Sequence, residues 1–370
     1  MQSPLKNSGV KAMNSSSDSI TSKQLVTLII TSQVGIGILT LPSKLAESVG
    51  HDGWISIIAS GIICSGIIAV MMLLLKRYKN KSLIGINKIL YGKYLGNLLN
   101  LYVIFYLFYT SSYLFRTLIG IVQQTTLYST PVVVISLIII TPSFYLCTFG
   151  LKYICRYSIL VYLVLAVTLF QFILIGNKLN LTFLLPVGAS GLPKLAQSLN
   201  TSVIALIGFE LVAVIYPYIT DKIKLLKKAQ LANLATCIFY IIIVLVTTAM
   251  FGENFLKRLV YPLFTLSRTY RAPIFERLDL FYIALWFPAM AGSTRLYLYS
   301  TQLAFRECFN LKGKNIYLVV NVFLVIAFSR LPRNFMDLER YAGYLSFMAL
   351  SILALILFSY FFSLITKRGL

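Results

Sequence analysis

The sequence predicts an all-α polytopic membrane protein, in which ten transmembrane helices form an inverted repeat of five plus five with a broken first and a broken sixth helix. Apolar residues make up 58% of the 370 residues, charged residues only 12%, and the mean hydropathy is +0.82. A soluble chain of this size could not hide so much apolar surface from water. Long apolar segments recur along the chain, and two of them carry helix-breaking residues at matching places in the two halves.

The first break lies in TSQVGIGILTLP, within the first long apolar segment. Glycine destabilises a helix interior, and the proline of this stretch, Pro42, cannot donate to the helical hydrogen-bond ladder. Lipid tolerates a broken backbone only where it is buried in protein or lines a wet cavity. We therefore expect a ligand site at the four residues of this break, which are Val34, Gly35, Ile36 and Gly37.

The second break lies in IGFEL, where Gly208 is followed closely by the acidic Glu210. Two interrupted helices at corresponding places in two halves of a chain point to a transporter-type binding site. The alternative is that these glycines only allow close packing, which is common in membrane helices.

The ten spans follow from the apolar segments and the polar or proline-containing connections between them. They cover about residues 22–49, 53–75, 95–127, 131–149, 157–175, 194–218, 229–251, 278–305, 316–328 and 341–365. We expect a single transmembrane domain over residues 21–370, with repeat one at about 21–176 and repeat two at about 194–366. Residues 1–20 are Ser- and Asn-rich and predict a flexible cytoplasmic tail, in which Asp18 or Ser19 caps the first helix.

Several spans have local signatures. In the second, Gly61, Ser65 and Ala69 recur every four positions, which indicates a close helix contact. The basic segment after it predicts a loop with a short interfacial helix, and the third span is long enough to require tilt. The connection before the sixth span is rich in proline and glycine and predicts a loop, whereas Pro217 ends or kinks that span.

The third span also carries a polar face. Its residues Tyr102, Tyr106, Tyr109, Tyr113 and Arg116 follow one another at alternating steps of four and three, so they share one side of a helix. Phenols and a guanidinium facing lipid would be costly, so we expect this face to look into the bundle. It either lines a ligand cavity or forms a tyrosine seam that bonds neighbouring helices.

Ionisable residues within the spans are predicted to be buried and functional. These buried charges are Arg116, Glu210 and Arg295. Glu210 is either a ligand or proton site, or half of a buried ion pair with one of the two arginines. In the outer half of the first span, Lys44 and Glu47 are three residues apart and predict a local ion pair.

The basic residues set the orientation. They give a net charge of +22 and gather in short loops, which is typical of positive-inside bias and of contact with the lipid bilayer, so we expect no nucleic-acid partner. Outside the spans, twenty basic residues lie on the side of the two termini and ten on the other, which places both termini in the cytoplasm. Five spans per half then require the two halves to be inverted.

Residues 253–276 form a different kind of segment. Apolar residues at three- and four-residue steps alternate there with the basic residues Lys257, Arg258, Arg268 and Arg271. This pattern predicts an amphipathic helix lying on the outer surface. Apposition to the membrane is the simplest role, but we expect the segment to gate a ligand pocket or to dock a partner.

The first break also predicts how a ligand is held. Free N–H groups at the start of the outer half-helix favour a carboxylate, and carbonyls at the end of the inner half-helix favour an ammonium, so an amino acid zwitterion suits both. We expect the rest of the ligand site to come from the third, sixth and eighth spans. The residues expected there are Tyr106, Tyr109, Ala205, Gly208, Phe209, Glu210, Ser293 and Thr294.

Enzymatic chemistry finds no support in the sequence. It contains no P-loop, HExxH or GxSxG pattern and only one histidine, His51, in a short loop. The five cysteines lack CxxC or metal-ligand spacing and are interpreted as reduced packing residues. We therefore expect no catalytic residue, no cofactor and no metal site.

The residues also support a resemblance. VGIGILTLP together with ALIGFELVAVIYPYI resembles the amino acid/polyamine/organocation permease superfamily. PLFTLSRTYRAPIFERLDLFYIALWF and the ten-span length are similar to the spore germination permease family, the B subunits of the nutrient germinant receptors of endospore-forming bacteria. The resemblance covers nearly the whole chain, about residues 20–366.

This resemblance implies a LeuT-like fold and a multi-pass protein of the spore inner membrane. It implies that a small nutrient, typically an amino acid, binds at broken helices one and six and triggers germination together with germinant receptor A and C subunits. Fold alone does not separate sensing from transport, so the alternative is a secondary active amino acid transporter coupled to protons or sodium. A purely structural scaffold would leave the broken helices unexplained.

Overall fold

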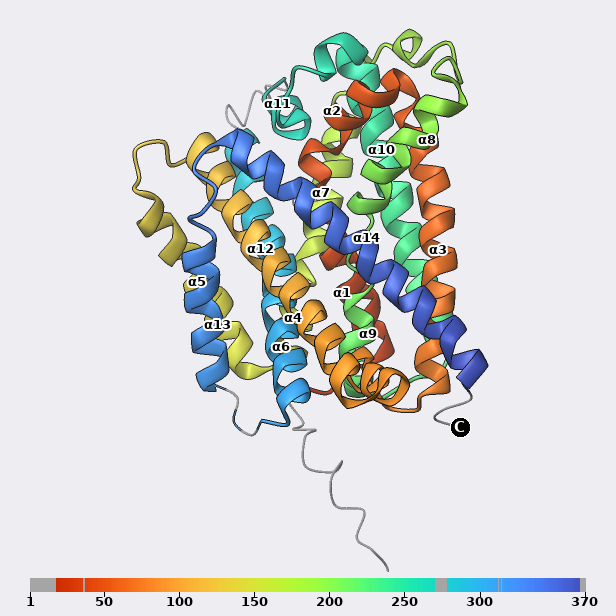
Figure 1. Ribbon diagram of the computed structural model, residues 1–370. Coiled ribbons are helices and arrows are strands. Elements are labelled where there is room, and N and C mark those ends of the chain that lie inside the picture. The colour runs from red at the N-terminus through yellow and green to blue at the C-terminus, as the bar shows by residue number, and fades with distance from the viewer. Residues whose placement is uncertain (1–17, 36, 270–277, 312, 314, 367–370) are drawn as a thin grey trace, which may run out of the picture.

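The structure is a computed structural model that describes residues 18–35, 37–269, 278–311, 313 and 315–366, and it is built of helices (Figure 1). The longer helices in chain order are α1 (Ser22–Gln33), α2 (Gly37–Val49), α3 (Gly53–Arg77), α4 (Leu83–Thr125), α5 (Val132–Phe149), α6 (Leu151–Tyr157), α7 (Leu160–Leu174), α8 (Gly191–Ala205), α9 (Leu211–Ile215), α10 (Leu225–Leu256), α11 (Pro262–Thr269), α12 (Leu278–Phe309), α13 (Asn315–Phe328) and α14 (Phe335–Thr366). Four short 3₁₀ turns join them, namely η1 (Gly50–Asp52), η2 (Gly176–Lys178), η3 (Leu181–Leu184) and η4 (Tyr216–Tyr218).

Within the described ranges, six helical stretches are long and apolar enough to cross a membrane. They are Gly37–Arg77, Leu83–Thr125, Val132–Phe149, Leu151–Leu174, Leu225–Leu256 and Met336–Thr366, with Ile316–Phe328 as a shorter apolar helix. Large apolar side chains such as Ile62, 70% exposed, and Phe347, 74% exposed, cover the outside of the bundle. Such a surface suits lipid and not water, and the predicted class of polytopic all-α membrane protein is confirmed.

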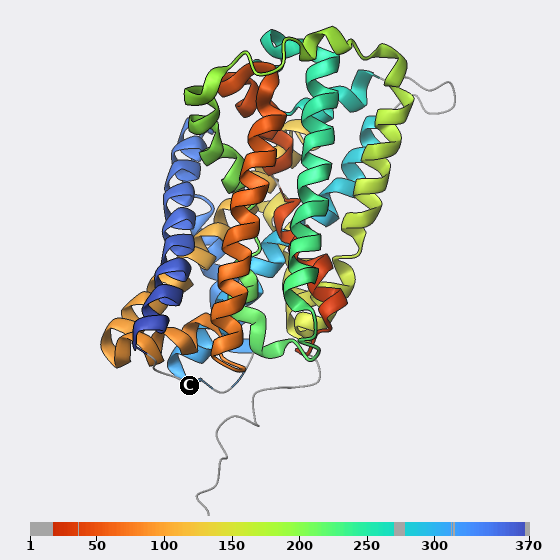
Figure 2. The same ribbon diagram turned by 90° about the vertical axis from the view of Figure 1, so that its right-hand side faces the viewer.

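The first and sixth predicted spans are both broken. α1 ends at Gln33 and α2 begins at Gly37, while α8 ends at Ala205 and α9 begins only at Leu211. Pro42 lies inside α2 and not in the break, so the glycines and not the proline mark where the first helix stops. Figures 1 and 2 show that the start of α1 and the end of α14 lie at one end of the bundle, with α2 and α11 at the other.

The long helix α4 contains the predicted interfacial helix. Gly92 has φ 78° and ψ −176°, and this non-helical residue separates the short helical stretch 83–91 from the spanning part. Only glycine adopts such a backbone without strain, so the chain turns here from the membrane end into the bundle. The connection before the sixth span is a loop with short helical turns, as its composition predicts, but α8 begins at Gly191, three residues earlier than expected.

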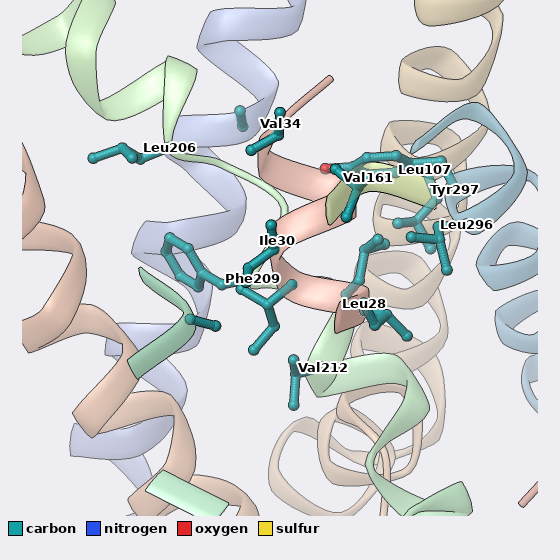
Figure 3. Packing of buried hydrophobic residues seen from close by; sticks show 14 of the residues in the cluster. Leu28, Ile30, Val34, Leu107, Val161, Leu206, Phe209, Val212, Leu296 and Tyr297 are labelled. Atoms are coloured by element: carbon teal, nitrogen blue, oxygen red, sulfur yellow. The ribbon is translucent and has the colours of Figure 1, made fainter. Parts of the chain in front are cut away.

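The core lies around α1, which the other helices surround (Figure 3). Leu28, Ile30 and Val34 of α1 and its end are at most 4% exposed and pack with Phe209 and Val212 of the second break. Because lipid is as apolar as these side chains, their burial stabilises the bundle mainly through close packing. A core of this kind holds both broken segments in one place.

The described end of the predicted tail is anchored. Asp18 is 1% exposed, and its carboxylate accepts hydrogen bonds from Tyr299 Oη and from the Leu151 backbone N–H. Neither Asp18 nor Ser19 is the cap that the sequence predicts, because Thr21 caps α1 in a capping box with Gln24. The chain just before α1 is therefore tied to α12 and α6 at this end of the bundle.

Candidate functional site

The two breaks contact each other directly. Gly208 has φ +134°, and a Cβ atom there would lie 2.7 Å from the Ser32 carbonyl carbon, so only glycine fits this approach. The Gln33 side-chain amide donates to the Leu206 carbonyl oxygen at 2.7 Å. Tyr240 of α10 donates to the Gln33 carbonyl oxygen at 2.6 Å. Free carbonyls at the ends of α1 and α8 thus find partners, and the two breaks form one structural unit.

A cavity of about 410 Å³ begins at this unit and extends toward the end of the bundle that carries α2 and α11. Its inner wall is formed by the breaks, by α4 and by α12, through Ser32, Gln33, Gly35, Gly37, Tyr106, Ile204, Ala205, Ile207 and Tyr297. Its other end carries charged residues, which are Lys44, Glu47, Lys257, Arg258 and Glu339. A volume of this size accommodates a small molecule.

Glu210 lies behind the cavity wall and not in the lining. It is 4% exposed and accepts hydrogen bonds from Tyr106 Oη at 2.9 Å, from Tyr297 Oη at 2.6 Å and from the Gly208 backbone N–H at 2.7 Å. The carboxylate precedes α9, where the helix dipole favours a negative charge. Both tyrosines line the cavity, so Glu210 is linked to the cavity through its hydrogen bonds with them.

Neither arginine of the spans pairs with Glu210, so the predicted buried ion pair is wrong for these residues. Arg295 is 2% exposed, donates to the Pro288 carbonyl oxygen at 2.9 Å and lies 4.4 Å above the ring of Tyr157. Arg116 is only half-buried and donates to the Pro332 carbonyl oxygen at 3.1 Å. Tyrosine hydroxyls and a backbone N–H, not a guanidinium, satisfy the buried carboxylate.

The tyrosine face of α4 serves both roles that its spacing left open. Tyr106 and Tyr113 line the cavity. Tyr102 hydrogen-bonds Ser351 at 2.5 Å, and Tyr109 donates to the Tyr341 carbonyl oxygen at 3.0 Å and stacks on the Tyr341 ring. Tyr109, expected at the ligand site, therefore faces α14 and is absent from the described lining.

Of the other expected site residues, some line the cavity and some are buried in the core. Gly35, Gly37 and Ala205 line the cavity. Phe209 is fully buried in the core beside α1, and Val34 is buried at the end of α1 (Figure 3). Ile36 lies outside the described residues.

On α12, a Cβ atom at Gly35 would lie 3.0 Å from Ser293 Oγ, so this serine packs against the first break. Its hydroxyl donates to the Met290 carbonyl oxygen at 2.8 Å. Thr294 is 1% exposed, and its hydroxyl has no hydrogen-bond partner among the described residues. Neither residue belongs to the described cavity lining, and of the two it is Ser293 that packs against the first break.

Sequence reasoning missed three polar residues at the breaks, which are Gln33, Asn233 and Tyr297. Gln33 Nε2 donates to Asn233 Oδ1 at 3.1 Å, and Asn233 Nδ2 donates to the Gly61 carbonyl oxygen at 3.2 Å. A polar side chain within an apolar span is itself a signal of function. That signal was present at Gln33, directly before the glycines.

The charged end of the cavity differs from the predicted pairing. Lys44 lies 3.7 Å from Glu339 of α14, and the predicted pair with Glu47 is not among the ion pairs of the described ranges. Lys257, which also lines the cavity, lies 3.6 Å from Glu253. The first pair joins α2 to α14, whereas the second is local to the end of α10.

His51 belongs to the same region, in the turn η1 between two spans. Its Nδ1 lies 3.1 Å from Glu253 Oε2 and its Nε2 lies 2.7 Å from the Pro186 carbonyl oxygen. Both partners accept, so only the doubly protonated ring satisfies both. Burial disfavours the charged ring, but the hydrogen bonds to Pro186 and Glu253 outweigh it and raise the pKa of His51 above its ordinary value of 6.5.

The apolar face of α11 is covered by the bundle. Leu263, Phe264 and Leu266 are at most 3% exposed, and the ring of Phe264 lies 6.2 Å from that of Trp286 on α12. The predicted apolar face therefore packs on α12, and its burial does not require a membrane surface. Arg271 lies outside the residues that the structure describes.

Two solved structures with a similar fold are transporters. The fold resembles Mhp1, a nucleobase-cation-symport-1 family transporter in a closed conformation with bromovinylhydantoin bound, with a TM-score of 0.64 at 11% identity, covering 96% of this chain and 81% of that one. It also resembles a Na⁺-coupled sialic acid symporter in a substrate-bound outward-open state, with a TM-score of 0.61 at 15% identity, covering 90% and 76%. These likenesses confirm the LeuT-like fold.

Relatives in sequence are germination proteins. The chain is 26% identical over 366 residues to spore germination protein B2 of Bacillus subtilis (strain 168), covering 96% of this chain and 98% of the relative. It is 24% identical over 323 residues to spore germination protein GerQB of Bacillus cereus, covering 87% and 89%. A profile of the family described as "Spore germination protein" matches residues 19–337. The resemblance is therefore confirmed, and this integral membrane chain belongs to the spore germination protein family.

Proposed function

We propose that this protein is the nutrient-sensing integral membrane subunit of a spore germinant receptor. It binds a small nutrient, an amino acid by preference, in the cavity at the two helix breaks and triggers germination together with A and C subunits. The observation that carries the proposal is the cavity of about 410 Å³ that both breaks help to line. The proposed location is the inner membrane of the spore, with both termini in the cytoplasm.

The cavity offers complementary ends to a zwitterion. The start of α2 at Gly37 presents free backbone N–H groups to a carboxylate, while the end of α1 at Gln33 presents oxygens to an ammonium. Gly35 and Gly37 let the ligand approach the backbone, and Tyr106 and Ala205 form walls. Val34, Ile36, Tyr109, Gly208, Phe209, Ser293 and Thr294 are proposed to shape the site, while Arg116, Glu210 and Arg295 remain the charges to test.

Direct binding is the test of this proposal. Purified protein in nanodiscs is titrated by calorimetry with the proteinogenic L-amino acids, and co-purification with the A and C subunits is measured in parallel. We expect saturable binding of at least one amino acid and a stable complex with the other subunits. A protein that is folded by its melting curve yet binds none of the amino acids would contradict the proposal.

The second candidate is a secondary active amino acid transporter coupled to protons or sodium. It is favoured by the fold shared with the two symporters and by the buried Glu210 behind the cavity wall. Proteoliposomes loaded with buffer and given a radiolabelled amino acid with an inward proton or sodium gradient distinguish the two. Gradient-driven accumulation would support transport, whereas binding without accumulation supports sensing.

Since these relatives and neighbours are germination proteins and symporters, we propose no catalytic activity.

A further inference from the structure

Gln33 belongs to the lining of the cavity, and its side-chain amide has an acceptor atom that no described residue uses. Gln33 is 2% exposed and lines the cavity at the end of α1. Its Oε1 atom is buried and has no hydrogen-bond partner among the described residues. An unpaired buried oxygen is costly, so an acceptor left open at this place points to a donor that arrives with a ligand.

The direction of this amide is fixed by a relay of hydrogen bonds. Gln33 Nε2 donates to the Leu206 carbonyl oxygen at 2.7 Å and to Asn233 Oδ1 at 3.1 Å, which uses both of its N–H groups. Asn233 in turn donates to the Gly61 carbonyl oxygen at 3.2 Å and to Ser65 Oγ at 3.1 Å. Because a carbonyl can only accept, Asn233 must point its NH₂ group at Gly61 and its oxygen at Gln33.

A flip of the Gln33 amide is therefore unfavourable. It would place Oε1 against two acceptors, the Leu206 carbonyl and Asn233 Oδ1. The relay from α3 through α10 to the second break thus forces the free position of Gln33 to be an acceptor. The helix dipole adds negative potential at this end of α1. The open acceptor and the dipole therefore both favour a positively charged donor.

We propose that Gln33 Oε1 accepts a hydrogen bond from the ammonium group of the bound amino acid and that this contact sets the requirement for an amine. Asn233 is a positioning residue, since it fixes the orientation of the Gln33 amide. The inference rests on the proposed function, because it names which group of the nutrient each end of the cavity recognises. It assigns the amine end to a residue outside the glycine break.

The test compares amino acids with the same molecules lacking the amine. The probes are L-alanine with propionate, L-valine with isovalerate and L-leucine with isocaproate, titrated into the parent protein and into Gln33→Met in nanodiscs. Methionine keeps the length of the side chain but has no strong acceptor. In the parent we expect the amino acid to bind more tightly than its partner acid. In Gln33→Met this ratio should fall about tenfold or more, since a hydrogen bond to a charged group is lost.

The control variant is Gln171→Met, a nearly buried glutamine on α7 that is absent from the cavity lining. It should leave the ratio unchanged. Gln33→Glu keeps an oxygen at the same place and should retain the preference for the amine even if its melting temperature falls, which covers the case in which Gln33→Met fails to fold.

A merely structural role of Gln33 would weaken both members of each probe pair alike and leave their ratio unchanged, and that result would overturn the inference. Loss of the amine preference in a folded Gln33→Glu protein would overturn it as well. A parent protein that binds no amino acid would instead overturn the proposed function. The two failures are therefore distinct.

Discussion

At the scale of single residues, Glu210 gives the sharpest stability prediction. One of its oxygens accepts two tyrosine hydroxyls and the other accepts the Gly208 N–H. In Glu210→Gln, the new NH₂ group must face either that N–H or the two tyrosines. We expect a loss of about 1–3 kcal/mol in stability, which is the cost of leaving a buried donor unpaired, measured as a lower melting temperature in detergent.

Tyr297→Phe is the matched control, since it removes only one donor and should cost less, about 1 kcal/mol. An unchanged melting temperature of Glu210→Gln would contradict the structural role. If the nutrient response or its pH dependence then changed, Glu210 would instead bind the ligand or a proton. No change in either property would exclude both roles.

The glycines of the first break give a second prediction. No atom lies within 4 Å of a Cβ built on Gly37, whereas a Cβ on Gly35 would lie 3.0 Å from Ser293 Oγ. Gly37→Leu should therefore fill the inner part of the cavity and abolish amino acid binding and nutrient response at normal protein level. Gly35→Leu should also lower the protein level because it displaces α12. The measurements are binding in nanodiscs and immunoblotting of membranes.

Gly66→Leu is the control for Gly37→Leu. Gly66 is exposed on α3, with open space where its Cβ would lie, and it is not part of the cavity lining. Normal binding by the Gly37 variant would remove this residue from the site.

His51 predicts a pH dependence. Because its pKa is raised in the folded protein, its contribution to stability is present below about pH 6.5 and is lost as the pH rises through the raised value. Asp52 and Glu253 face the ring, and Lys257 pairs with Glu253. The melting temperature of the parent should therefore fall as the pH rises from about 6.5 through the raised pKa of His51. It is the only histidine in the chain, so His51→Gln should flatten this slope. An equal slope in both proteins would contradict the assignment.

At the scale of elements, the sequence predicted the breaks but not what they contact. Gly35, Gly37 and Gly208 change the local backbone, and their effect on a helix can be read from the chain alone. The partners are remote in sequence: Gln33 bonds Leu206, 173 residues away, and Lys44 pairs with Glu339 of α14. Helical spacing placed Tyr106 and Tyr109 on one face, yet Tyr106 lines the cavity whereas Tyr109 contacts α14.

The segment from the end of α10 to α11 gives an element-scale prediction. The apolar face of α11 is already buried, whereas Phe255 and Val260 before it are about half exposed. Because Lys257 and Arg258 line the cavity mouth, gating explains the segment better than apposition to the membrane. The double reversal Lys257→Glu with Arg258→Glu should alter the nutrient response while co-purification with the A and C subunits stays intact. Arg268→Glu with Arg271→Glu is the comparison, and loss of co-purification there would indicate partner docking.

Small, graded effects that track the content of anionic lipid would favour membrane apposition instead. If both double variants assemble and respond like the parent, the segment is only a surface linker and has no gating or docking role.

At the scale of the whole molecule, the fold is that of symporters while the sequence relatives are germination proteins. The same bundle thus serves a family whose members are named for a response and not for transport. A sensor needs the ligand cavity and a change of shape that partner subunits detect, but it does not need release on the other side. The hydrogen bonds of Asp18 to Tyr299 and Leu151 tie the chain before α1 to α12 and α6, while the cavity extends to the opposite end of the bundle.

The orientation of the bundle gives the last prediction, since the excess of basic residues predicts that the start of α1 and the end of α14 face the cytoplasm. All five native cysteines are buried, so a single introduced cysteine can be labelled selectively. Tyr94 follows the kink of α4 at Gly92 and Ile223 precedes α10, and they are 90% and 73% exposed. Leu192 and Met336 lie at the starts of α8 and α14 and are 82% and 81% exposed. The α4 kink and the start of α10 lie at the end of the bundle with the start of α1, and the starts of α8 and α14 lie at the other end (Figures 1 and 2). In intact cells, a membrane-impermeant maleimide should label Leu192→Cys and Met336→Cys, whereas Tyr94→Cys and Ile223→Cys should react only after permeabilisation. The reverse pattern would invert the protein in the membrane and turn the cavity mouth toward the cytoplasm, which a receptor for external nutrients could not use.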